Sequence, residues 1–197
     1  MKFIPDIIYE DNHLLVIIKP QNMPVQEDES EDMDLLRGIK QYIKERDNKP
    51  GNVFLGLVHR LDRPTGGVMV FAKTTKCASR LTEQLKSHEM KKSYLCVALG
   101  NFSQPSGRLS CYLVKDNKNN IVNLATKSDY GAKEAILDYE LLESKQNMNL
   151  VFPVLLSMVN IVIIALMVYL FKNINVYLGL TILGCLFIIA TFVAIKY

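Results

Sequence analysis

Residues 59–67 read His-Arg-Leu-Asp-Arg-Pro-Thr-Gly-Gly, and this stretch decides how the rest of the chain is interpreted. It lies between two apolar runs, 53–58 and 68–71, and is therefore predicted to be a loop that joins two strands. Its one acid, Asp62, stands between two arginines, and the closing glycines allow backbone to approach a ligand closely. An aspartate in a loop is more often an Asx turn or a surface charge, but these residue types also suit an ionised carboxylate beside a polyanion.

The segment before this loop alternates apolar runs with turn residues. Residues 7–9 and 14–18 are predicted to form two strands joined by a turn. Residues 27–34 hold six acids in eight positions, which is typical of a solvated loop. Asp34 is a candidate N-cap for a helix, because the apolar residues of 35–43 recur at helical spacing.

The segment after the loop mixes helix and strand patterns. A helix is predicted over about 75–87, followed by strands at 93–99 and 135–142. A polar turn is predicted at 116–120. Because these elements do not alternate as a regular βαβ repeat, the fold class is predicted to be α+β.

The C-terminal quarter has a different composition. Residues 150–171 and 176–195 carry no charged side chain, and about 20 apolar residues suffice for a helix to span a bilayer. The short polar link 172–175 suits a helical hairpin. We therefore expect two transmembrane helices that anchor a cytoplasmic domain, the alternative being a buried helix pair inside a soluble domain.

The loop and its surroundings resemble one known family. His59-Arg60-Leu61-Asp62, with Thr65 and Gly67, is similar to the signature of the RluA-type RNA pseudouridine synthases. Residues 8–25, 71–74 and 91–95 resemble the segments that precede and follow this signature in the family. The resemblance runs in order from residue 4 to about residue 151, and Gly66 departs from it because the family more often has serine there.

This resemblance implies a fold and a reaction. It implies a mixed, mainly antiparallel sheet and the isomerisation of uridine to pseudouridine in rRNA or tRNA, with no cofactor. Independently of the resemblance, no metal is predicted, because the histidines show no metal-ligand spacing with cysteines or acids. Asp62 corresponds to the catalytic aspartate, which acts as a nucleophile or a base at C1′. Arg60 corresponds to the arginine that helps to hold RNA with its target base extruded, and Tyr94 to the aromatic residue that stacks on that base. His59, Thr65 and Gly67 complete the implied substrate-binding loop.

The charge distribution agrees with an RNA-binding face. Residues 35–94 contain 13 Lys and Arg against five acids, a local charge of +8. Phosphate contacts need such clusters, although ordinary surface lysines also form them.

The resemblance ends before the family's closing motif, Gly-Arg-x-His-Gln-Ile-Arg, whose arginine pairs with the catalytic aspartate. No such motif follows residue 151 in this sequence. We therefore expect residues 1–149 to form an incomplete catalytic domain with weak or absent catalysis, because a carboxylate without its cation is harder to ionise in a partly buried cleft. Two readings remain open, a pseudouridine synthase by descent and a membrane-tethered, non-catalytic RNA-binding module.

Overall fold

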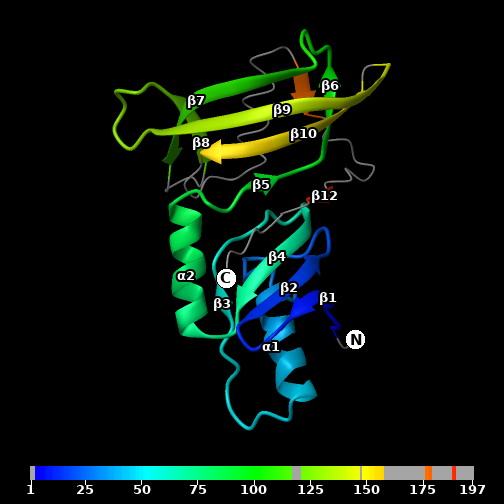
Figure 1. The fold of residues 1–197 in the computed structure, drawn as a ribbon, viewed down its shortest axis with the longest axis vertical. Coiled ribbons are helices and arrows are strands. Elements are labelled where there is room, and N and C mark those ends of the chain that lie inside the picture. The colour runs from blue at the N-terminus through cyan, green and yellow to red at the C-terminus, as the bar shows by residue number, and fades with distance from the viewer. Residues whose placement is uncertain (1–2, 117–120, 147, 158–175, 179–187, 190–197) are drawn as a thin grey trace. The chain divides into compact units, whose positions relative to one another are not determined.

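The computed structural model describes residues 3–116, 121–146, 148–157, 176–178 and 188–189 (Figure 1). The chain divides into two compact units, Met1–Met90 and Lys91–Tyr197. Each unit contains its own antiparallel sheet, and the two helices belong to the first unit.

The sheet of the first unit runs in the order β1-β2-β4, and β3 also pairs with β4. Its strands are β1 (Asp6–Glu10), β2 (Leu14–Lys19), β3 (Gly56–Leu57) and β4 (Gly66–Ala72). All of these pairings are antiparallel, and the register of β2 on β4 sets Lys19 opposite Gly67. The inward positions of β2 are Leu15, Ile17 and Lys19, each with 0% exposure. Period-two alternation thus carries a lysine into the same buried row as two aliphatic side chains.

Two helices complete the first unit, and each begins directly after a side chain that caps its N-terminus. Helix α1 (Leu35–Arg46) is capped by Asp34, whose side chain accepts a hydrogen bond from Arg37 N at 2.9 Å. Helix α2 (Thr75–Lys86) is capped by Thr74. Helix α2 packs closely on β3, since a Cβ added at Gly56 would lie 3.1 Å from the Cβ of Ala78.

The sheet of the second unit runs in the order β11-β6-β10-β9-β7-β8, and β5 also pairs with β10. Its strands are β5 (Lys92–Ser93), β6 (Cys96–Gly100), β7 (Ser106–Asp116), β8 (Ile121–Ala125), β9 (Lys133–Lys145), β10 (Met148–Ser157) and β11 (Val176–Leu178). A further short strand, β12, covers Ile188–Ile189. The long strands β7, β9 and β10 are adjacent, as Figure 1 shows, and are joined by antiparallel pairing throughout.

The expected transmembrane hairpin is wrong. Residues 148–157 form strand β10, hydrogen-bonded to β6 on one side and to β9 on the other, where the first span was expected to begin as a helix at 150. Within the described ranges, no helix is both long enough and apolar enough to cross a membrane. A strand that is paired on both sides and largely covered reads as a continuous apolar run, so hydropathy alone does not distinguish it from a helical span. The remainder of the two predicted spans lies outside the described residues, apart from β11 and β12.

The other differences concern strand lengths. The strand expected over 53–58 is reduced to β3, and the strand expected over 93–99 is divided into β5 and β6. Strands β7 and β8 were not predicted, although apolar residues recur at alternate positions in parts of both, which is the pattern of a half-buried strand. The polar turn predicted at 116–120 lies almost entirely outside the described residues.

A charged cluster ties the edge strand β1 to the end of α1. The carboxylate of Glu10 accepts two hydrogen bonds from Arg46, at 2.6 and 2.8 Å, and a third from Lys73 Nζ at 2.8 Å. Arg46 also lies over the ring of Tyr42, with its guanidinium carbon 5.4 Å from the ring centroid. The hydrogen bonds from Arg46, supported by Lys73, lower the pKa of Glu10 to about 2.

Glu10→Gln is expected to lower the free energy of unfolding at pH 7 by about 1–2 kcal/mol, because it removes the carboxylate that pairs with Lys73 and with Arg46, which keeps its pairing with Asp47. Since the folded-state pKa lies below the ordinary 4.5, this contribution is present above pH 4.5 and is lost as the pH falls toward 2. Urea unfolding at pH 7 and at pH 3 measures it. Glu83→Gln, on the exposed face of α2, is the control, and an equal loss in both variants would contradict the assignment.

Candidate active site

Residues 59–67 form the connection between β3 and β4 in the first unit and enter β4 at its first residues. The backbone N–H of Thr65 donates to the carbonyl oxygen of Asp62 at 2.9 Å, which closes a turn on the predicted catalytic residue. The side chain of His59 accepts a hydrogen bond at Nε2 from Val70 N at 3.1 Å, so it fastens the start of the loop to β4. Gly67 has φ of 143°, a backbone conformation that favours glycine.

The loop rests on a buried ammonium group. Lys19, at the end of β2, donates from Nζ to the carbonyl oxygens of Pro20 at 2.9 Å, Arg63 at 3.1 Å and Thr65 at 2.7 Å. An ammonium has three N–H donors, and these contacts use all of them. Two of the three carbonyls belong to the loop and follow Asp62 within three residues, so one side chain from β2 fixes the path of the loop directly after the acid.

Asp62 and Lys19 also interact through their charges. Burial lowers the pKa of Lys19 to about 8, while the carboxylate of Asp62 acts in the opposite direction and favours the ammonium form. Lys19 therefore remains protonated at neutral pH. Asp62 thus has a buried cation nearby, in addition to the arginines that flank it in sequence.

The sequence analysis did not identify Lys19 as part of the site. The signal was present, because Leu15, Ile17 and Lys19 share one face of a strand whose other inward residues are apolar. A charged residue in that phase is almost never fully buried unless it is paired. A lysine at an inward position of β2 was therefore the sequence signal for this buried contact.

The two arginines of the loop contact the segment before α1: Arg63 contacts the acidic run 27–34, which was predicted to be a solvated loop, and Arg60 contacts Gln26 directly before it. Arg63 Nη1 donates to Ser30 Oγ at 2.8 Å and pairs with Asp28 at 3.3 Å, and its Nη2 contacts Asp32. Arg60 donates to the side-chain oxygen of Gln26 at 3.3 Å. These residues are exposed, as predicted, but they are bound to the loop by named contacts.

Gly66 occupies the position where the family more often has serine. A Cβ built at Gly66 would lie 2.9 Å from Cγ of Gln21 and 3.4 Å from the carbonyl oxygen of Lys19. A side chain at this position would therefore displace the flexible side chain of Gln21. Glycine suits the close approach of the loop to the residues that follow β2.

Tyr94, the predicted stacking residue, belongs to the second unit, whereas the other predicted site residues lie together in the first. Its backbone N–H donates to the carbonyl oxygen of Pro153 at 2.9 Å, which joins the segment after β5 to β10. Its side chain is only 2% exposed. Stacking on a base therefore requires one face of this ring to become accessible.

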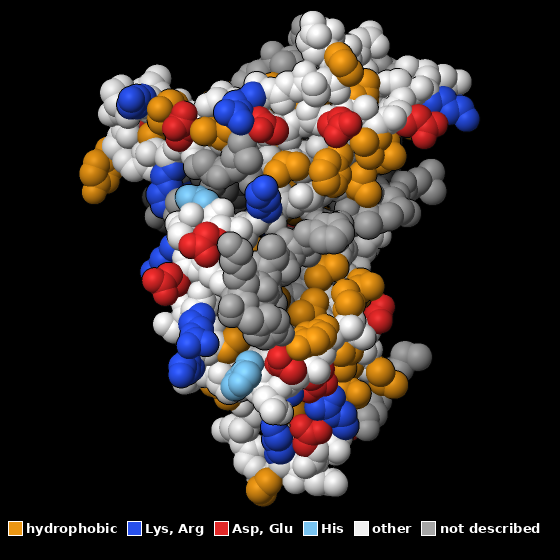
Figure 2. Space-filling view, viewed as in Figure 1, with side chains coloured by type: hydrophobic (Ala, Val, Ile, Leu, Met, Phe, Trp, Pro, Cys, Tyr) orange, Lys and Arg blue, Asp and Glu red, His pale blue; other side chains and the backbone are white. Residues whose placement is uncertain are grey.

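Basic side chains accompany both parts of the predicted site. Figure 2 shows Lys and Arg side chains along α2, which carries Lys76, Arg80 and Lys86. Lys91, three positions before Tyr94 in the sequence, is exposed. Burial lowers the pKa of the following residue, Lys92. The sign of this charge suits a polyanion.

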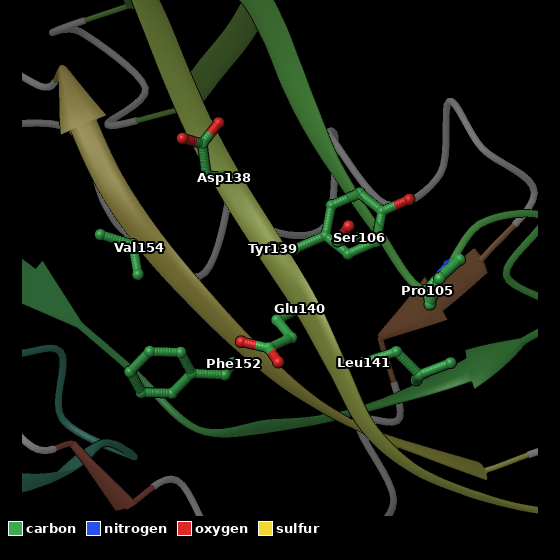
Figure 3. A pocket seen from close by; sticks show the side chains of 8 residues that line it. All are labelled: Pro105, Ser106, Asp138, Tyr139, Glu140, Leu141, Phe152 and Val154. Carbon is green, nitrogen blue, oxygen red and sulfur yellow. The ribbon is translucent and has the colours of Figure 1, made fainter.

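One pocket lies apart from these residues. It occupies about 430 Å³ on the second unit, against β7, β9 and β10 (Figure 3). Its lining consists of Pro105, Ser106, Asp138, Tyr139, Glu140, Leu141, Phe152 and Val154. Asp138 is paired with Arg108 at 2.7 Å, but the charged residues of the lining itself are both carboxylates. The pocket therefore has the wrong charge for a phosphate group and contains none of the predicted site residues.

Comparison with known proteins supports the resemblance. Residues 13–158 match the family described as RNA pseudouridylate synthase. Ribosomal large subunit pseudouridine synthase D of Yersinia pestis is 40% identical over 99 residues, which cover 50% of this chain and 30% of that protein. Ribosomal large subunit pseudouridine synthase C of Buchnera aphidicola is 31% identical over 135 residues, which cover 68% of this chain and 41% of that protein. The chain thus matches less than half the length of these relatives.

Solved structures support the fold. Human RNA Pseudouridylate Synthase Domain Containing 4 superposes with a TM-score of 0.71 at 21% identity, covering 88% of this chain and 66% of that one. Human RNA Pseudouridylate Synthase Domain Containing 1 gives a TM-score of 0.65 at 16% identity with the same coverage. The expected type of antiparallel sheet is therefore confirmed.

Lys19→Met is expected to lower the free energy of unfolding by about 2–3 kcal/mol, because it leaves buried carbonyl oxygens without their donor. The folded-state pKa of Lys19, about 8, lies below the ordinary 10.5, so the cost of burying its charge falls as the pH rises through that interval. The difference between wild type and variant should therefore widen from pH 8 to pH 10. Urea unfolding measures both effects, and Lys44→Met, at an exposed position, is the control. Losses of unfolding free energy that are equal in the two variants and independent of pH would contradict the role of Lys19.

Proposed function

The chain belongs to the RNA pseudouridylate synthase family, and on that premise we propose that it isomerises uridine to pseudouridine in structured RNA. The observation that carries the proposal is the loop 59–67, whose motif acid lies beside a buried ammonium within the part of the chain that matches the family. The names of the curated relatives refer to the large ribosomal subunit, which makes ribosomal RNA the first substrate to test and transfer RNA the second.

The reaction moves one bond and one proton. The bond between N1 of uracil and C1′ of ribose breaks, the base turns, and a bond forms between C5 and C1′. The hydrogen at C5 is lost as a proton and N1 gains one, so substrate and product are isomers. Asp62 is the proposed catalytic residue, acting as a nucleophile at C1′ or as a base there, and either role requires its ionised form.

The geometry of the loop supports this role for Asp62. The turn closed by Thr65 and the hydrogen bonds from Lys19 hold the backbone from Asp62 to Thr65. The positive charge of Lys19 favours the carboxylate over the neutral acid. An acid that is held in place and kept ionised needs less reorganisation when the substrate arrives.

The other residues of the loop are proposed to bind the substrate. Arg60 and Arg63 present exposed guanidinium groups, which suit phosphate oxygens. His59 fastens the start of the loop to β4, and Gly67 has the positive φ with which the chain enters β4. Tyr94 is proposed to stack on the extruded uracil, since the base has to leave its stack before C1′ can be reached.

The expectation of weak catalysis stays a prediction. It rests on the missing arginine of the family's closing motif, which the sequence does not contain after residue 151. Lys19 is a cation that interacts with Asp62 from within the first unit and supplies part of the same electrostatic effect. The rate of pseudouridine formation by this chain therefore measures how well Lys19 replaces the arginine.

Asp62→Asn is expected to reduce pseudouridine formation by roughly 10²–10⁴-fold or more, because an amide serves neither as nucleophile nor as base. Release of tritium from ribosomal RNA that carries 5-tritiated uridine measures the reaction, and a filter-binding assay measures RNA affinity. Asp6→Asn, an exposed substitution on β1, is the control and should retain full activity. Turnover retained in Asp62→Asn would refute the catalytic role, and RNA binding without turnover in every protein would favour a non-catalytic RNA-binding module.

A further inference from the structure

The residues between β2 and α1 form a segment that the proposed reaction does not use. We name residues 26–32, Gln-Glu-Asp-Glu-Ser-Glu-Asp, the acidic segment. It has its own local structure, because the side chain of Asp28 accepts a hydrogen bond from Ser30 N at 3.0 Å and Ser30 Oγ accepts one from Asp32 N at 3.3 Å. Asp28, Ser30 and Asp32 are thereby presented together.

These three side chains meet a single guanidinium. Arg63 donates from Nη1 to Ser30 and Asp28 and from Nη2 to Asp32, so both of its terminal nitrogens are engaged. The same pair of nitrogens forms the fork with which arginine binds phosphate oxygens. At the other end of the segment, Gln26 accepts a hydrogen bond from Arg60. The acidic segment therefore contacts both arginines that flank Asp62 in sequence.

The contact is exposed rather than buried. The side chain of Arg63 is 41% exposed, and those of Asp28 and Asp32 are 40% and 55% exposed. Ion pairs in such positions contribute little to stability and exchange readily with water and salt. The loop 59–67, in contrast, is held from its inner side by the buried Lys19. Another anion can therefore replace the acidic segment at Arg63, while Lys19 continues to hold the loop.

We propose that the acidic segment is an intramolecular competitor of RNA, occupying the phosphate-binding face of Arg63 until an RNA phosphate displaces Asp28 and Asp32. This inference rests on the proposed function, since it takes Arg63 as a phosphate contact. The affinity for a polyanion that binds Arg63 is reduced in proportion to the fraction of molecules in which Arg63 is paired with the acidic segment. RNA that supplies additional contacts overcomes this cost, whereas a weak, non-specific polyanion gains less from Arg63.

Two double variants separate the contact from the charge. Asp28→Asn with Asp32→Asn removes both carboxylate charges opposite Arg63, while the amide oxygen introduced at position 28 still accepts the hydrogen bond that orders the segment. Glu27→Gln with Glu29→Gln removes the same number of charges from the same segment. In the described part of the chain, neither Glu27 nor Glu29 forms an ion pair with Arg63.

The first measurement needs no RNA. The full chain is treated with p-hydroxyphenylglyoxal, which reacts with accessible guanidinium groups, and the adduct at Arg63 is followed by mass spectrometry. We expect the rate of labelling to rise about three- to tenfold in the Asp28/Asp32 variant and less than about twofold in the Glu27/Glu29 variant. Equal rates in the two variants would overturn the proposal, because charge alone would then govern access to Arg63.

The second measurement is the dissociation constant for in vitro transcribed large-subunit ribosomal RNA. The Asp28/Asp32 variant should bind about three- to tenfold more tightly than the Glu27/Glu29 variant at the same salt concentration. Equal or weaker binding by the Asp28/Asp32 variant would overturn the competitor role, even when Arg63 is labelled faster.

The two measurements also keep this proposal distinct from the proposed function. Absence of RNA binding in wild type and in both variants would refute the proposed function and the competitor role together. Wild-type RNA binding and turnover, combined with unchanged Arg63 labelling in the Asp28/Asp32 variant, would refute only the competitor role.

Discussion

The ammonium group of Lys19 is the contact on which the candidate site depends. Three carbonyl oxygens, two of them within the loop that carries Asp62, share its three N–H donors. A buried charge is costly, and burial accordingly lowers the pKa of this lysine. The cost is tolerable because every donor is used and because an aspartate lies close enough to favour the charged form. Removal of this group would leave the carbonyl oxygens of Arg63 and Thr65 without the donor that holds them.

The sequence predicted the elements around the site wherever a local signal was strong. Helix α1 begins directly after Asp34, which was the predicted N-cap. In β2, the apolar residues Leu15 and Ile17 occupy buried positions. Lys19 was not predicted as part of the site. The alternation of side chains along a strand predicts that Lys19 points inward, but it does not predict which carbonyl oxygens accept its hydrogen bonds. Two of the three carbonyls come from residues 44 and 46 positions further along the chain, and only the fold brings them to β2.

The acidic run and the apolar tail show two further limits of sequence reasoning. Residues 27–33 are exposed, as their charge indicates, whereas Asp34 is buried as the N-cap of α1, and Arg63 gives part of the run a specific partner. Residues 150–157 belong to β10, which is hydrogen-bonded to β6 and β9, and do not begin a helical membrane span. In both cases composition predicted the environment correctly in kind, polar or apolar, and tertiary pairing decided the structure.

Amide hydrogen exchange tests the central claim most directly. The amide of Thr65 is bonded to Asp62 and that of Val70 to His59, so both report on the order of the loop that carries the acid. In Lys19→Met under native conditions, these two amides should lose protection while the amides of β7 and β9 in the second unit retain theirs. Unchanged protection at Thr65 and Val70 would contradict the claim that the buried ammonium of Lys19 holds the site in place.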